Sequence, residues 1–161
     1  MIKYLLIAVL WLTSYAHASP VVLTDDSVNI RHFEIGYLVN SPHSYTIDEA
    51  MNADFINAPN RLSLPSSQLD IWVKLSIKNG TGKEIDCNIH NSISYFNREM
   101  DFYETEAGKV IDQKHIDLFA WTGNTELLHG TDSILPIHLN PGELKTYYFH
   151  FVSPAYQYLS I

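Results

Sequence analysis

The sequence has a single cysteine, few basic side chains and no long apolar run beyond its first residues. It contains 10 Lys and Arg against 18 Asp and Glu, a formal net charge of −8 at pH 7. An acidic surface of this kind repels nucleic acid phosphates and anionic lipid headgroups, so neither is an expected partner. Cys87 has no cysteine to pair with, and it alternates in phase with Ile85 and Ile89. We therefore interpret it as a small buried hydrophobic residue.

Familiar catalytic and metal-binding patterns are also absent. The sequence has no Gly-x-Ser-x-Gly elbow, no glycine-rich phosphate loop and no His-Glu-x-x-His motif. His115 and Asp117 form a tight His–carboxylate pair, and an isolated pair is more often a surface feature than a metal site. We therefore expect no catalytic residue, no metal and no cofactor. An exported hydrolase is left as a third hypothesis, for which the sequence identifies no nucleophile or acid.

The first 18 residues have the layout of a secretory signal peptide. Lys3 supplies a positive charge, an apolar run follows from Tyr4 to Leu12, and Ala16-His17-Ala18 is a small-x-small cleavage site. The apolar run is much shorter than the ~20 residues that a membrane-spanning helix requires. We expect cleavage after Ala18, a periplasmic or other extracytoplasmic location, and a single domain over residues 19–161.

Beyond the leader, short runs of alternating apolar and polar residues are separated by turn signals. Residues 69–79, LDIWVKLSIKN, alternate in this way and stop at Asn79-Gly80, which is typical of a strand with one buried face. We expect the next strand, residues 84–93, to be its partner across that turn. Asn140-Pro141-Gly142-Glu143 has Pro and Gly where a type II turn requires them. Similar runs predict strands over residues 33–39, 100–103, 110–113, 135–139, 144–153 and 156–161.

One helix interrupts the strands. Residues 46–49 fit a capping box, with Thr46 as the N-cap and Glu49 reaching back, so we expect a short helix over about residues 47–55. Residues 61–68 are expected to be an extended connection, and residues 121–130 a long loop. About nine short strands with short connections and one helix predict an all-β fold, an antiparallel β-sandwich or jelly roll.

Aromatic side chains on polar faces or in loops are the richer functional signal. In an acidic exported β-sandwich they can stack on sugar rings while Asp, Asn and Arg side chains bind hydroxyl groups. Trp72 also fits burial beneath the predicted helix, which we favour, whereas Trp121 lies in a loop, where binding residues concentrate. For Arg98, an ion pair at a strand edge explains the residue as well as a ligand contact does. The predicted ligand-binding residues are Trp72, Tyr95, Arg98, Asp101, Tyr103 and Trp121.

The order of these features resembles a known family. GYLVNSPHSYTIDEAM, LDIWVKLSIKN, DFYETEAGKV and ILPIHLNPGELKTYYFHFVS follow one another as in the second extracellular type of sensory module of bacterial seven-transmembrane receptors with diverse intracellular signalling modules. The resemblance covers roughly residues 28–161. It implies a jelly roll similar to carbohydrate-binding modules, which detects an extracytoplasmic ligand and passes that event to a membrane-embedded receptor portion.

We therefore expect an extracytoplasmic sensory or ligand-binding module, with a carbohydrate or similar small molecule as the ligand. The alternative is a structural or protein-interaction β-sandwich of the periplasm, whose exposed aromatic side chains meet another protein. The stretch SPAYQYLSI has no closing turn signal. In the family it resembles, this position leads toward the first membrane helix. We therefore expect a receptor front end truncated there, with a last strand that is short and only partly paired.

Overall fold

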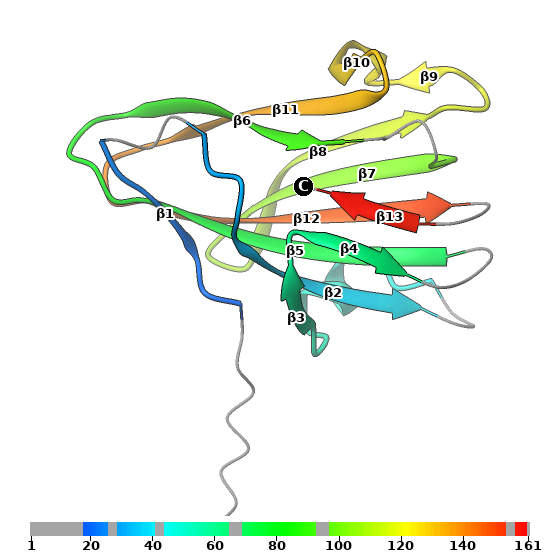
Figure 1. The fold of residues 1–161 in the computed structure, drawn as a ribbon, viewed down its shortest axis with the longest axis horizontal. Helices are drawn as coiled ribbons and strands as arrows, with labels where there is room; N and C mark the ends of the chain where they lie inside the picture. Colours follow the sequence, from blue (N-terminus) through cyan, green and yellow to red (C-terminus); the bar gives the residue numbers. More distant parts are fainter. Residues whose placement is uncertain are drawn as a thin grey trace, which may run out of the picture.

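The computed structural model describes residues 18–25, 29–40, 44–64, 69–92, 97–153 and 157–160. The predicted signal peptide lies outside these residues except for Ala18. The described strands form three sheets, of eight, three and two strands, and Figure 1 shows β6 and β11 lying together, apart from the strands of the large sheet. The expected all-β sandwich is confirmed, while the finer assignment as a jelly roll stays a prediction.

The largest sheet has the order β3-β2-β5-β12-β7-β8-β9, and β1 pairs with the C-terminal end of β5. β12 lies at its centre and pairs antiparallel with β5 along ten residues and with β7 on its other side. β1 is the only strand here that runs parallel to its neighbour. The eight strands are β1 (Val21–Leu23), β2 (Glu34–Asn40), β3 (Ile56–Pro59), β5 (Leu69–Asn79), β7 (Glu99–Glu106), β8 (Lys109–Asp117), β9 (Thr122–Gly123) and β12 (Leu144–Ser153).

The second layer is smaller. Its three-stranded sheet has the order β10-β11-β6, with β6 (Ile85–Asn91), β10 (Leu128–His129) and β11 (Asp132–Leu139). A single 3₁₀ turn, η2 (Thr125–Leu127), precedes β10. The two-stranded sheet joins β4 (Arg61–Leu64) to β13 (Gln157–Ser160), and all four residues of β13 pair with β4. The expected last strand therefore exists and is short, but all of its described residues are paired, so the expectation that it is only partly paired is wrong for them. Truncation of the domain stays a prediction.

The core between the layers is built by alternating positions of the long strands. Phe149 and Phe151 of β12 are fully buried in it, and burial of each such side chain stabilises the fold by roughly 1.5–3 kcal/mol. The same alternation on the neighbouring strands and on the second layer adds Ile71, Val73, Leu75, Ile77, Met100, Phe102, Ile89, Leu135, Ile137 and Leu139.

The expected pairing of residues 84–93 with residues 69–79 is wrong. β6 belongs to the other layer, where Cys87 pairs with Ile137 of β11, and β5 pairs instead with β1, β2 and β12. The turn after Asn79 is therefore a crossover between layers. Gly80 is required in it because an added Cβ would lie 2.8 Å from the carbonyl oxygen of Leu23 in β1.

Asn79 ties this crossover to the one between β11 and β12. Its side chain is fully buried, and its Nδ2 donates to the carbonyl oxygens of Lys83 at 2.8 Å and Leu139 at 3.0 Å. Its Oδ1 accepts from the amide and the hydroxyl of Thr81 at 2.9 and 2.7 Å. Its own amide donates to the carbonyl oxygen of Glu143, at 2.8 Å, in the predicted turn. In that turn Glu143 N donates to Asn140 O, and Gly142 has the positive φ, 75°, that a type II turn needs.

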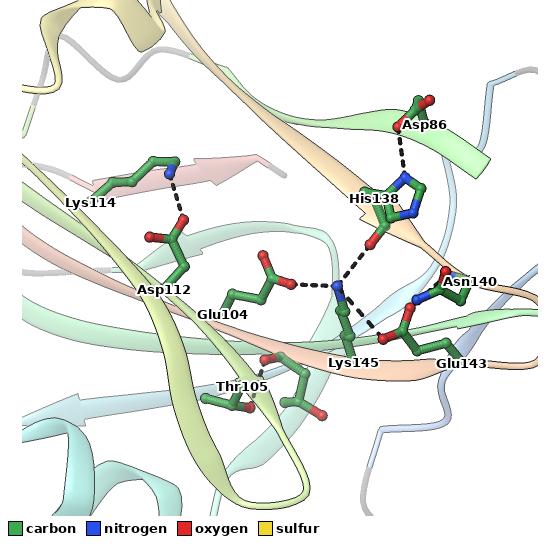
Figure 2. Close-up of polar contacts among 10 residues, drawn as sticks. Asp86, Glu104, Thr105, Asp112, Lys114, His138, Asn140, Glu143 and Lys145 are labelled. Atoms are coloured by element: carbon green, nitrogen blue, oxygen red, sulfur yellow. Dashed lines mark hydrogen bonds and ion pairs between the residues drawn. The ribbon is translucent and has the colours of Figure 1, made fainter. Parts of the chain in front are cut away.

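A buried lysine joins the two layers near these crossovers (Figure 2). Lys145 of β12 is 8 % exposed, and its Nζ lies 2.7 Å from Glu104 Oε1 in β7 and donates to the carbonyl oxygen of His138 in β11 at 2.9 Å. Burial lowers the pKa of Lys145, but the hydrogen bond and charge of Glu104 outweigh it and raise the pKa overall. The ammonium group therefore stays charged, with protein oxygens in place of water.

The short helix α1 (Ile47–Met51) has the predicted capping box. Thr46 N donates to Glu49 Oε2 at 2.8 Å, and Glu49 N donates back to Thr46 Oγ1 at 3.4 Å. The helix ends at Met51 rather than near residue 55 because the chain turns at Asn52, whose side-chain amide donates to Asp48 O, and soon enters β3. It packs against Trp72 on the outer face of the large sheet, the face away from the core.

Several strands are longer or more numerous than the alternation indicated. The structure has 13 strands in its described residues, including β4 within the expected connection and β9 and β10 within the expected loop. β8 runs from Lys109 to Asp117 rather than over residues 110–113. Most of its side chains are exposed, so it has little apolar alternation, and its pairing with β7 defines it.

Replacement of Asn79 by alanine removes four side-chain hydrogen bonds and leaves buried partners unsatisfied. We expect Asn79→Ala to lower the free energy of unfolding by about 2–4 kcal/mol, measured by urea denaturation. The matched control is Asn88→Ala, at an exposed position of β6, which should change it by less than about 0.5 kcal/mol. Equal effects of the two variants would contradict the structural role of Asn79.

Candidate functional site

A row of aromatic and titratable side chains crosses the outer face of the large sheet. The strand registers place Trp72 of β5 opposite His150 of β12, His150 opposite Asp101 of β7, and Asp101 opposite His115 of β8. Facing residues in neighbouring strands have Cβ atoms about 4.5–5.5 Å apart. Side chains that are 78 residues apart in sequence, from Trp72 to His150, are thereby brought into contact.

His150 lies between two carboxylates. Its Nε2 is 2.8 Å from Asp70 Oδ1, and its Nδ1 is 3.1 Å from Asp101 Oδ2. The second oxygen of Asp101, Oδ1, lies 2.7 Å from His115 Nδ1. An imidazole can donate from both nitrogens only when it is protonated. The geometry therefore favours a His150 imidazolium held by two negative charges.

The electrostatics agree with that geometry. Burial disfavours the charged form of His150, but hydrogen bonds and negative charge from Asp101 and Asp70 outweigh it and raise the pKa of His150 to about 9. Burial likewise raises the pKa of Asp101, but hydrogen bonds from His150 and His115 reverse this and lower it overall. At neutral pH the row therefore contains a positive charge between two negative ones.

Aromatic rings cover the inner end of the row. The indole of Trp72 stacks on His150, with ring centroids 4.5 Å apart, and on Tyr103, at 5.7 Å. Trp72 is 1 % exposed and packs with Ala50 of α1 and Tyr148 of β12. It is thus buried beneath the helix, the interpretation that we favoured from sequence. Burial and the charge of Asp101 raise the pKa of Tyr103 to about 12, so its hydroxyl stays protonated.

The row becomes more accessible toward β8. The side chains of His150 and Asp101 are 12 % and 17 % exposed, whereas that of His115 is 45 % exposed. A molecule approaching from solvent would therefore meet His115 and the edge of the Asp101 carboxylate before the other members. His115 connects the buried charges to the surface.

A turn with two exposed aromatic side chains follows β8. Asp117 Oδ1 accepts from the amides of Phe119 and Ala120 at 2.8 and 2.9 Å, and this folds the chain back into β9. Phe119 is 72 % and Trp121 66 % exposed. Arg98 lies 5.6 Å over the Phe119 ring and also forms the ion pair with Glu99 that the sequence left open.

The structure brings three of the predicted site residues together, namely Trp72, Asp101 and Tyr103. Arg98 and Trp121 lie at the end of the same strands. Arg98 contacts the turn after β8, and Trp121 lies within that turn. Tyr95 lies outside the described residues. Whether these residues bind a ligand stays a prediction.

Sequence reasoning did not include Asp70, His115 or His150 in the site. β7 and β8 are joined by a turn at Ala107 and Gly108, whose φ angles are both positive, 48° and 73°. Such a two-residue turn sets the register of the strands that flank it. That turn alone would place Asp101 opposite Lys114, and a bulge at Glu104 and Thr105 shifts the register by one residue, which brings His115 there. His150 had no local signal.

The described part of the chain contains no group of three or more His, Cys, Asp or Glu side chains arranged to hold a metal ion. Nor does any helix among the described residues have the length and apolar character needed to span a membrane.

The fold is that of an all-β sandwich module with a polar and aromatic row on one outer face. Residues 34–161 match the model of the family described as 7TMR-DISM extracellular 2, and the chain belongs to this family. The resemblance found in the sequence is thus confirmed. The family is an extracellular module of seven-transmembrane receptors, which supports an extracytoplasmic position. A search of curated proteins gave no match.

We expect the stability of the fold to decrease as the pH rises through the pKa of His150. An unfolded histidine titrates near pH 6.5, about 2.5 units below the folded value of about 9. The stabilisation is therefore complete below about pH 6.5 and is lost as the pH passes about 9, a change of roughly 3 kcal/mol. Urea denaturation at a series of pH values measures it.

Two variants separate this effect from other titrations. His150→Gln should be less stable than the unchanged protein near pH 6, and the difference should shrink toward pH 9. The matched control is His138→Gln, which breaks an exposed pair with Asp86 and should retain most of the pH dependence. A flat profile of the unchanged protein over this range would contradict the imidazolium.

Proposed function

We propose that this chain is the sensory, ligand-binding module of a bacterial signal-transduction receptor. We further propose that its ligand is a small polyhydroxylated molecule, a carbohydrate being the favoured class, bound on the outer face of β7 and β8. The observation that supports this best is the row from Trp72 to His115, in which charged groups held in place by one another become accessible at one end.

The chemistry of the accessible end suits hydroxyl groups. Asp101 is an acceptor with a lowered pKa, and His115 presents a half-exposed imidazole beside it. The exposed indole of Trp121, in the turn after β8, offers an apolar face of the kind that stacks on sugar rings. A few placed polar groups next to an aromatic surface are the usual composition of a small-molecule site.

The same row offers a route for the signal. A hydroxyl group that competes for Asp101 would change the bonds of His115 and His150, and His150 stacks on Trp72 beneath α1. We propose that binding at the surface is transmitted in this way to the helix, and from the module to the membrane-embedded portion of the receptor.

A protein-interaction module is the second candidate function. The exposed side chains of Phe119 and Trp121 favour it, because two large aromatic side chains in one turn are a typical contact for a protein partner.

Thermal-shift screening with neutral sugars and small organic acids tests the first proposal, because a ligand that binds only the folded state raises its melting temperature. At a concentration 100 times the Kd the shift should be on the order of 5–10 °C. Asp101→Asn should weaken binding of any sugar found by about tenfold or more. The matched control is Asp132→Asn, which alters an Asp–His pair in the other layer.

Different outcomes distinguish the two candidates. A sugar that shifts both variants equally does not bind at this row. A flat response across the panel, together with a dimer in light scattering that Trp121→Ala abolishes, would favour the protein-interaction module.

A further inference from the structure

A cavity lies on the opposite side of the large sheet, between the two layers. It has a volume of about 520 Å³, within the range of small-molecule sites of ~300–1,000 Å³. Residues of β1 and β6, each an edge strand of its own layer, contribute to its lining. Its walls include Val21 and Leu23 from β1, Leu75 from β5, Ile85 and Cys87 from β6, and Ile137 from β11.

Most of the lining residues are apolar, and polar residues contribute a substantial part of the exposed lining. Val21, Leu23 and Cys87 are partly buried against the core, so they retain surface that a ligand can cover. Asn29, Asp86 and further residues of β6 contribute the polar part of the lining. With a formal net charge of −8, the protein disfavours an anionic ligand.

A buried tyrosine, Tyr147, is the strand neighbour of the lining residue Leu75 on the inner face of the large sheet and does not itself line the cavity. Tyr147 is fully buried, and its hydroxyl has no hydrogen-bond partner among the described residues. Its ring is in register with Leu75, which lines the cavity. Burial first, and then the negative charge of Glu104, raise the pKa of Tyr147. The phenol therefore stays protonated and can donate a hydrogen bond.

We propose that this cavity is a second binding site, for a small uncharged molecule with an apolar body and one hydrogen-bonding group. A buried polar group without a partner calls for an explanation, and a ligand group that reaches past the cavity wall at Leu75 and accepts from the Tyr147 hydroxyl supplies one. The site is separate from the outer face. Leu75 and Tyr147 point into the core between the layers, and successive side chains of a strand point to opposite faces, so their neighbours in β5 and β12 point to the outer face.

The test uses N-phenylnaphthylamine, a neutral apolar amine whose fluorescence rises in an apolar environment. The purified protein should bind it saturably. Cys87 is the only cysteine in the sequence, so its reaction with a thiol reagent reports on the cavity wall. At a probe concentration ten times the Kd, labelling of Cys87 should slow about tenfold.

Adjacent residues of β1 provide a matched pair of variants. Val21 lines the cavity, whereas Val22 is 50 % exposed and does not. Val21→Trp should fill the cavity and abolish probe binding, and Val22→Trp should retain it. Tyr147→Phe should weaken binding severalfold. Thermal unfolding shows whether each variant folds, and protection of Cys87 in the unchanged protein decides the matter if Val21→Trp does not fold.

Three results would overturn the proposal. They are the absence of saturable binding, binding that leaves the labelling rate of Cys87 unchanged, and equal binding by folded Val21→Trp and Val22→Trp. Unchanged affinity of Tyr147→Phe would overturn the role of the hydroxyl. None of these results bears on sugar binding at Asp101, so the two proposals stand or fall separately.

Discussion

The register of β12 between β5 and β7 is the constraint on which both faces of the large sheet depend. Side chains alternate along a strand, so the same ten residues place Phe149 and Phe151 in the core and Tyr148 and His150 on the outer face. A slip of one residue would exchange the two sets, burying His150 among apolar side chains and exposing the phenylalanines. The core and the candidate site are therefore products of one register.

On the outer face, charge is buried only where it is paired. His150 is largely covered by Trp72 and by the cluster beneath α1, and two carboxylates offset the cost of removing it from water. The alternation of acid and base from Asp70 to His115 spreads this compensation over four strands, β5, β12, β7 and β8. It also makes each member depend on its neighbours, which is the property a sensor needs if a contact at the surface is to reach the interior.

Between the layers, directional polar contacts complement the apolar core. Asn79 and Lys145 both form hydrogen bonds from the large sheet to β11 carbonyl groups, those of Leu139 and His138. Apolar packing resists separation of the sheets but is tolerant of sliding, whereas these bonds have preferred lengths and angles. They fix the layers near the crossovers, and the cavity lies between the layers, lined in part by the edge strands β1 and β6.

The sequence by itself determined the features that depend on residues a few positions apart. These are most of the strands, the capping box at Thr46 and the turn at Asn140, together with the burial of Trp72, since a tryptophan beside a predicted helix has much apolar area to cover. Only the tertiary structure decided that β6 crosses to the other layer and that His150 meets Asp101 and Asp70, 49 and 80 positions away. Strand partners follow from the packing of whole faces against each other, and no local pattern of residues encodes that choice.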